Sequence, residues 1–336
     1  MTTTINSIYF QGLDPKHIMV QISITNGIPS FIMVGLPSRT ISEAKERIRA
    51  ALQSIGLALP AKKIIINLAP ANIEKDGSHF DLAIMLGILT ELEIIPKHQL
   101  NTYLILGEIL LDSRITKISG ILPSAIYANR ENLGIICSKE NEKEALFSGN
   151  KKILAFSNII DVINHFTEKN IIKHSSSMPL DSSKFNIKYE EDFSDIIGQS
   201  TAKRALEIAA VGKHNILLVG SPGSGKSMLA KRFMSILPNL STEEILECSI
   251  IHSIAGSLPS GELITSRPFR SPHTSASLIS IIGGGKKVSP GEITLAHKGV
   301  LFLDELPHFS SQTLDSLRAP LEDKKVNITR ANERIQ

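Results

Sequence analysis

An eight-residue stretch from Gly220 to Ser227, reading Gly-Ser-Pro-Gly-Ser-Gly-Lys-Ser, has the residue types and spacing of a phosphate-binding loop. The glycines permit backbone conformations that a Cβ would forbid, so successive N–H groups can turn toward phosphate oxygens. Lys226 adds a positive charge for the terminal phosphates, and the Ser227 hydroxyl is a ligand for Mg²⁺. The stretch therefore predicts binding of ATP with Mg²⁺. The expected binding residues are Gly220, Ser221, Pro222, Gly223, Ser224, Gly225, Lys226 and Ser227.

Two carboxylates follow an apolar run 78 positions after Lys226, where Gly299-Val-Leu-Phe-Leu is succeeded by Asp304 and Glu305. Asp304 is expected to hold Mg²⁺ through water, and Glu305 to act as the general base that polarises the attacking water. An apolar run before Asp-Glu also marks any strand that leaves a core. Because the run is paired here with a phosphate loop, it predicts ATPase chemistry.

These residues can meet only if strands and a helix position them. The apolar run 215–220 predicts a strand before the loop, and the spacing of residues 228–237 predicts a helix that ends at Pro238. Residues 299–303 predict the strand that delivers Asp304. The connection between loop and carboxylates is long enough for an additional strand, expected at 247–251.

Composition limits the class of protein. A chain of 336 residues with 42% hydrophobic and 21% charged residues predicts two globular domains. Cys137 and Cys248 lie far apart, which argues against a zinc site or a disulfide framework and favours a reducing, cytoplasmic location. No segment predicts a signal peptide or a membrane span. The net charge of +3 is too small to indicate nucleic-acid binding.

The first half of the chain alternates strand and helix patterns. Val20, Ile22 and Ile24 alternate with polar residues as in a half-buried strand, and the face from Ile41 to Ile55 is helical. Further strands are expected at 31–34, 63–68, 103–106 and 133–137, and further helices at 80–89 and 122–129. This alternation predicts an α/β or α+β domain.

Three stretches carry a family resemblance: 27–37 (Gly-Ile-Pro-Ser-Phe-Ile-Met-Val-Gly-Leu-Pro), 67–72 (Asn-Leu-Ala-Pro-Ala-Asn) and 75–82 (Lys-Asp-Gly-Ser-His-Phe-Asp-Leu). They resemble the N-terminal domain of the ComM/YifB family, magnesium-chelatase-like AAA+ ATPases whose first domain is similar to the proteolytic domain of Lon. The resemblance implies an α/β fold with a Lon-protease-like domain at 1–168, a linker at 169–190, and a P-loop AAA+ αβα domain at 191–336. That second domain is expected to be incomplete, truncated before sensor 1 and the lid.

In Lon-type peptidases a Lys-Asp-Gly turn leads to a nucleophilic serine that a later lysine activates. Here Lys75-Asp76-Gly77 is present, but His79 aligns with the serine and Leu122 with the lysine. The alternative is that Ser78, one position early, pairs with Lys75 or Lys117. A one-residue shift usually destroys hydrogen-bond reach, so the domain is predicted to lack peptidase activity.

The resemblance also implies roles in the second half. Gly198 and Gln199 would lie beside the adenine. An intact relative would be a homo-oligomer, a hexameric ATP-driven motor that acts on branched DNA in recombination and natural transformation. Because sensor 1, the arginine finger and the lid are expected to be missing, this chain is predicted to be a fragment whose hydrolysis is weak or absent alone.

Candidate DNA contacts come from local charge. Arg267, Arg270, Lys286 and Lys287 belong to a stretch with a surplus of positive charge, which would suit a phosphate backbone. A solvated surface, or contact with the nucleotide of a neighbouring subunit, accounts for the same charges. Two other functions stay open: a nucleotide-binding regulatory or chelatase-like module that acts on a protein partner, and an inactive remnant.

Overall fold

The structure is a computed structural model of the 336-residue chain, and it describes residues 2–175, 189, 191–259, 261–285, 288–326, 328–329 and 334–335. The chain forms two compact units. The first comprises Met1–Pro179 with Ser253–Glu262, and the second comprises Leu180–His252 with Leu263–Gln336. No helix among the described residues is both long and apolar enough to cross a membrane.

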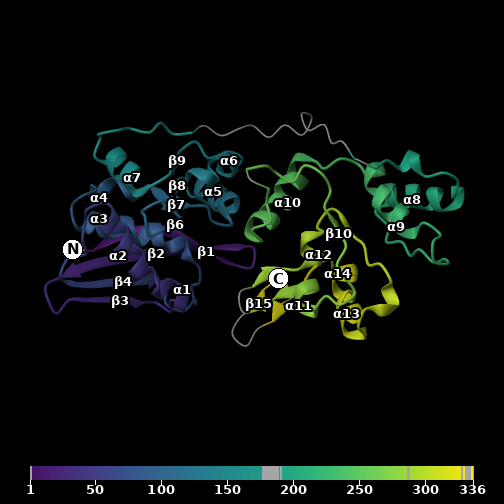
Figure 1. Cartoon of the computed structure of the whole chain (residues 1–336), viewed down its shortest axis with the longest axis horizontal. Helices are drawn as coiled ribbons and strands as arrows, with labels where there is room; N and C mark the ends of the chain where they lie inside the picture. Colours follow the sequence, from purple (N-terminus) through teal and green to yellow (C-terminus); the bar gives the residue numbers. More distant parts are fainter. Residues whose placement is uncertain are drawn as a thin grey trace. The chain divides into compact units, whose positions relative to one another are not determined.

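A seven-stranded mixed sheet is the centre of the first unit, with strand order β3-β4-β2-β1-β5-β8-β9 (Figure 1). The strands are β1 (Thr3–Gln11), β2 (Asp14–Thr25), β3 (Ser30–Val34), β4 (Lys63–Ala69), β5 (Tyr103–Ile105), β8 (Gly134–Ser138) and β9 (Ile153–Phe156). The long β1–β2 pair is antiparallel, whereas β5, β8 and β9 run parallel to one another. The predicted α/β class is confirmed. Strands β1 and β9 were not among the strands predicted from the sequence pattern.

Helices cover both faces of this sheet (Figure 1). They are α1 (Arg39–Ser42), α2 (Ala44–Ser54), α3 (Asp81–Glu91), α4 (Lys97–Leu100), α5 (Ile121–Arg130), α6 (Glu142–Leu146) and α7 (Ile159–Phe166), with short 3-10 turns η1 (Ser78–Phe80) and η2 (Lys139–Asn141) and the small ladder β6 (Glu108–Ile109) with β7 (Ile115–Thr116). Helices α2, α3 and α7 share one core with the sheet, and α5 and α6 share the other.

The two-residue period of a strand explains how one strand serves both cores. In β1, Ile5 belongs to the core with α2 and α3, while Ile8 belongs to the core with α5. Ten of the eleven residues of α3 are buried, so it is a central helix rather than an amphipathic surface helix.

A buried ion pair ties α2 to the start of α3. The Arg47 guanidinium donates from Nε and Nη2 to the two oxygens of Asp81, at 2.6 and 2.9 Å. Burial raises the pKa of the Asp81 carboxyl to about 6, and the neighbouring guanidinium opposes that shift. The pair fixes the helix that follows the Ser78–His79 turn.

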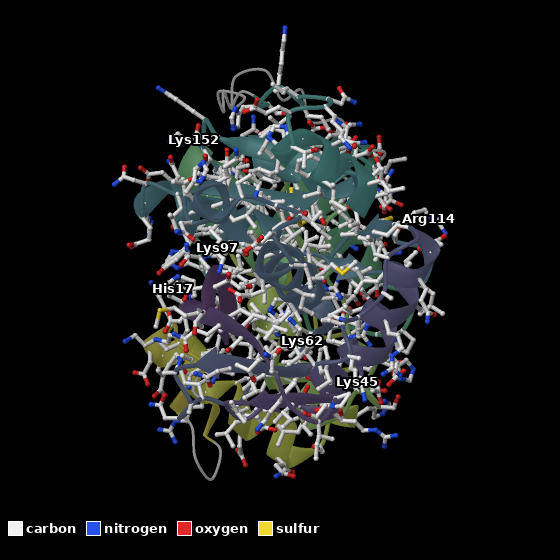
Figure 2. The ribbon with its side chains drawn as sticks, turned by 90° about the vertical axis from the view of Figure 1, so that its left-hand side faces the viewer. His17, Lys45, Lys62, Lys97, Arg114 and Lys152 are labelled. Atoms are coloured by element: carbon white, nitrogen blue, oxygen red, sulfur yellow. The ribbon has the colours of Figure 1, made fainter. Side chains whose placement is uncertain are left out.

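Several basic side chains of the first unit are labelled in Figure 2. The labelled residues are His17, Lys45, Lys62, Lys97, Arg114 and Lys152. Carboxylates lie within ion-pair distance of Lys45, Lys97 and Arg114, from Glu46, Glu91 and Asp112 respectively. Lys45, Lys97 and Arg114 are therefore each partly neutralised by a neighbouring carboxylate.

The predicted linker 169–190 begins with ordered contacts to the first unit. The Ile172 N–H donates to Nδ1 of His165 at 3.0 Å, and the Ser175 N–H donates to the carbonyl of Ile153 at 3.0 Å. Apart from residue 189, positions 176–190 lie outside the described residues.

The second unit contains mostly short elements. They are η4 (Phe193–Asp195), α8 (Ser200–Gly212), α9 (Lys226–Arg232), η5 (Phe233–Ile236), α10 (Thr242–Ile254, in this unit up to His252), β10 (Phe269–Arg270), α11 (Leu278–Ile282), β11 (Gly283–Gly284), β12 (Ser289–Pro290), α12 (Glu292–Leu295), β13 (Val300–Leu301), η6 (Leu306–His308), α13 (Ser311–Ser316), α14 (Arg318–Asp323), β14 (Ile328–Thr329) and β15 (Arg334–Ile335). Strands β10 and β13 pair in parallel, and a small core joins α8, α9 and η4.

Two predicted strands are wrong in this unit. Residues 247–251 lie inside α10, because Ile245, Cys248 and Ile251 recur at helical spacing and form its buried face. Residues 215–220 form no β-bridge within the described chain, and the Leu217 and Val219 side chains are 70% and 87% exposed. The segment is apolar, as the sequence shows, but an apolar segment forms a β-strand only where a neighbouring strand pairs with it through hydrogen bonds.

Candidate nucleotide-binding site

The glycine-rich loop leads directly into α9, which begins at Lys226. Gly223 and Gly225 have φ angles of 78° and 84°, in the left-handed region where a side chain is strained. The Gly225 carbonyl accepts the first intrahelical bond, from the Leu229 N–H at 2.9 Å. The loop therefore presents the N-terminal N–H groups of α9 on a backbone that only glycine adopts readily.

The Lys226 side chain folds back over the loop. Its Nζ donates to the carbonyl oxygens of Gly220 at 3.1 Å and Ser221 at 3.0 Å. The ammonium is thus held at the loop, where a positive charge is needed beside phosphate oxygens.

The structure brings Ser227 and Asp304 together across 77 positions of sequence. The Ser227 hydroxyl donates to Oδ2 of Asp304 at 2.8 Å, and Asp304 follows β13 closely. Hydroxyl and carboxylate oxygens are ligands that Mg²⁺ prefers, and Mg²⁺ usually takes only one or two protein groups besides phosphate and water. The described residues contain no cluster of three or more His, Cys, Asp or Glu side chains that could hold a metal ion.

Glu305 lies next to this pair in a left-handed backbone conformation, with φ of 52°. Its backbone N–H donates to Oδ1 of Asp304 at 3.0 Å, and its Oε2 lies 3.1 Å from Nδ1 of His308. The two neighbouring carboxylates therefore have different partners, one toward Ser227 and one toward His308. Sequence reasoning did not single out His308, although its place three residues after Glu305 was a usable signal.

The Gly198–Gln199 segment also reaches the loop. Gln199 precedes α8, and its Nε2 donates to the carbonyl of Ser224 at 3.2 Å. The adjacent Ile197 side chain is 96% exposed. The structure thus places the Gln199 amide at the loop, and contact of Gly198 and Gln199 with adenine stays a prediction.

Two of the four candidate DNA contacts, Arg267 and Arg270, form ion pairs and hydrogen bonds inside the second unit. Arg267 is only 9% exposed; it forms an ion pair with Glu244 and donates to the main-chain carbonyls of Pro238, Asn239 and Lys298. Arg270 makes two bonds to Glu292, at 2.6 and 2.8 Å. Both guanidinium groups therefore have internal partners, and contact of these residues with DNA stays a prediction. The other two candidates, Lys286 and Lys287, lie outside the described residues.

The first unit does not assemble a Ser–Lys pair at the shifted position. Lys75 is fully buried, and its Nζ donates to the main-chain carbonyls of Gly35 and Pro70. Burial lowers the pKa of this ammonium. Ser78 opens η1 and forms no hydrogen bond with Lys75, while Lys117 is exposed. Among the described contacts neither lysine is bonded to Ser78, and the lack of peptidase activity stays a prediction.

Comparison with known proteins finds similar sequences over nearly the whole chain. A family model described as magnesium chelatase, subunit ChlI, matches residues 192–336, and another, described as subunit ChlI of Mg-chelatase, matches residues 20–141. The uncharacterized protein YifB of Escherichia coli is 42% identical over 96% of this chain and 63% of its own length. The competence protein ComM of Haemophilus influenzae is 38% identical over 97% of this chain and 64% of its own length.

A shorter likeness covers 15% of the chain. An archaeal Lon protease of Archaeoglobus fulgidus is 51% identical over 51 residues, which is 15% of this chain and 8% of that protease. The chain thus spans just under two thirds of the length of YifB and ComM, and only a small part of Lon is similar to it.

Proposed function

Because this chain belongs to the ComM/YifB family of magnesium-chelatase-like AAA+ proteins, we propose that it binds ATP with Mg²⁺ and hydrolyses it at the Gly220–Ser227 loop. The observation that supports this most strongly is the hydrogen bond between Ser227 and Asp304, because it joins the two motifs that the chemistry requires. Neither motif alone would specify such a site.

Each residue has a definite part in the proposed reaction. Lys226 and the loop N–H groups bind phosphate oxygens, and the Ser227 and Asp304 oxygens would hold Mg²⁺, which neutralises charge on the phosphates when bound. Glu305 orients a water molecule and takes its proton. Gln199 stiffens the loop through the Ser224 carbonyl.

We further propose that the nucleotide site drives an oligomeric motor, hexameric as the family resemblance implies, that acts on DNA in recombination and transformation. The competence protein ComM is the relative that supports this role. A second function, a chelatase-like module acting on a protein partner, is favoured by one observation: Arg267 and Arg270 are used internally. DNA affinity that falls steeply with salt would support the motor, and its absence would support the module.

Lys226→Ala tests the nucleotide site. Two charge-assisted contacts to phosphate are lost, so we expect ATP affinity to fall about 100-fold, equivalent to about 2.7 kcal/mol. Isothermal titration calorimetry with Mg²⁺–ATP measures the change. Lys231→Ala removes the same charge from the same helix, away from the loop, and is expected to bind like the unmodified chain. Equal affinity for all three proteins would contradict the assigned site.

A further inference from the structure

We propose that His308 is a positioning residue for Glu305, holding its carboxylate in one direction through the 3.1 Å contact between Nδ1 and Oε2. The inference rests on the proposed function, because it concerns how the same site prepares its general base. His308 would touch neither the nucleotide nor the metal. Its effect would come through Glu305 alone.

The turn after β13 brings the two side chains together. Glu305 has left-handed φ, and its carbonyl accepts the His308 N–H at 2.8 Å, which closes a 3-10 turn. Pro307 lies within that turn, and its ring restricts the backbone φ. The Phe309 N–H then donates to the Leu306 carbonyl at 3.2 Å. The backbone thus fixes the imidazole at the third position after the base, where a one-turn contact is geometrically easy.

Glu305 needs such a partner because its side chain is 67% exposed. A carboxylate at the end of a flexible, solvated side chain samples several rotamers, and only a fraction of them face the water that must be deprotonated. With Oε2 engaged by His308, Oε1 is the oxygen left for that water. The backbone N–H of Glu305 is bonded to Asp304, so the base is restrained at both of its ends.

The contact also specifies where the proton lies. An ionised carboxylate only accepts hydrogen bonds, so Nδ1 of His308 must carry the hydrogen. A neutral imidazole then has its hydrogen on Nδ1 and not on Nε2. Asparagine offers an amide donor at nearly the same place as Nδ1, whereas alanine and leucine offer none. This difference separates a positioning role from a merely structural one.

Single-turnover ATP hydrolysis tests the inference in the full chain. We expect His308→Ala and His308→Leu to lower the rate about tenfold with ATP affinity unchanged, and His308→Asn to restore most of it. His297→Ala is a matched control, because it removes another exposed His–Glu contact, the 3.0 Å pair with Glu247. That variant should retain the full rate. Rates for His308→Ala equal to the unmodified chain would overturn the inference.

A nuclear magnetic resonance experiment does not depend on the rate. With isotope-labelled histidine at mildly alkaline pH, the His308 signal, assigned by its loss in His308→Asn, should show the hydrogen on Nδ1. Glu305→Ala should shift it toward the Nε2 form that prevails without a partner. A His308 tautomer that does not respond to Glu305→Ala refutes the contact. If Lys226→Ala also leaves ATP affinity unchanged, the proposed function fails separately from this inference.

Discussion

Glu305→Gln is expected to lower the single-turnover rate of ATP hydrolysis by about 10² to 10⁴, the usual contribution of a general base. The glutamine side chain has nearly the size of the glutamate and can still contact His308, but its amide cannot take a proton from water. ATP affinity should stay within a factor of about two, because Glu305 acts on the attacking water rather than on the bound nucleotide. Quenched-flow measurement with labelled ATP and excess protein reports the rate even when turnover is slow.

A surface carboxylate provides the control for that measurement. Glu322→Gln removes a charge that pairs with Arg318 on α14, where both side chains are well exposed. Its rate should equal that of the unmodified chain. If Glu305→Gln hydrolysed ATP as fast as Glu322→Gln, another group would be the base, and the assignment of Glu305 would be wrong.

Arg267→Ala is expected to destabilise the second unit by about 3 to 5 kcal/mol, the usual cost of removing one partner of a buried ion pair. The substitution removes the guanidinium partner of Glu244, which is 16% exposed and keeps the more distant Lys298 ammonium at 3.9 Å. It also leaves the carbonyls of Pro238, Asn239 and Lys298 without the donor that joins them. Urea denaturation monitored by circular dichroism measures the free energy of unfolding.

The same experiment distinguishes a structural arginine from a DNA contact. Arg204→Ala removes an exposed pair with Glu207 and should change stability by less than about 1 kcal/mol. If Arg267→Ala behaved like Arg204→Ala but weakened DNA binding and reduced its salt dependence, the internal role assigned to Arg267 would be contradicted.

Local patterns predicted the parts of the site that are set by neighbouring residues. The glycines of the loop and the helix that starts at Lys226 follow from backbone preferences within a few positions, and the apolar run before Asp304 contains the short strand β13. The α/β class of the first unit followed from alternation of strand and helix patterns. It could be predicted because hydrophobic periodicity is local.

Long-range partners could not be predicted in this way. The positive charge of Arg267 was visible, but its use depends on Glu244 and Lys298, which lie 23 and 31 positions away along the chain. In the sequence, a surplus of basic residues looks the same whether their side chains face solvent or form ion pairs inside the protein. Residues 247–251 show the same limit for secondary structure, because a short apolar run fits a strand or a helix until its packing partners are known.

The most direct test of the central claim is the Mg²⁺ dependence of ATP binding. Calorimetric titrations with ATP, in Mg²⁺ and in chelator, should show a clear gain in affinity from Mg²⁺ for the unmodified chain. Ser227→Ala and Asp304→Asn should each remove most of that gain, and the double variant should lose little more, because the 2.8 Å pair would act on one metal ion. An equal gain from Mg²⁺ in all four proteins would show that Ser227 and Asp304 do not form the metal site.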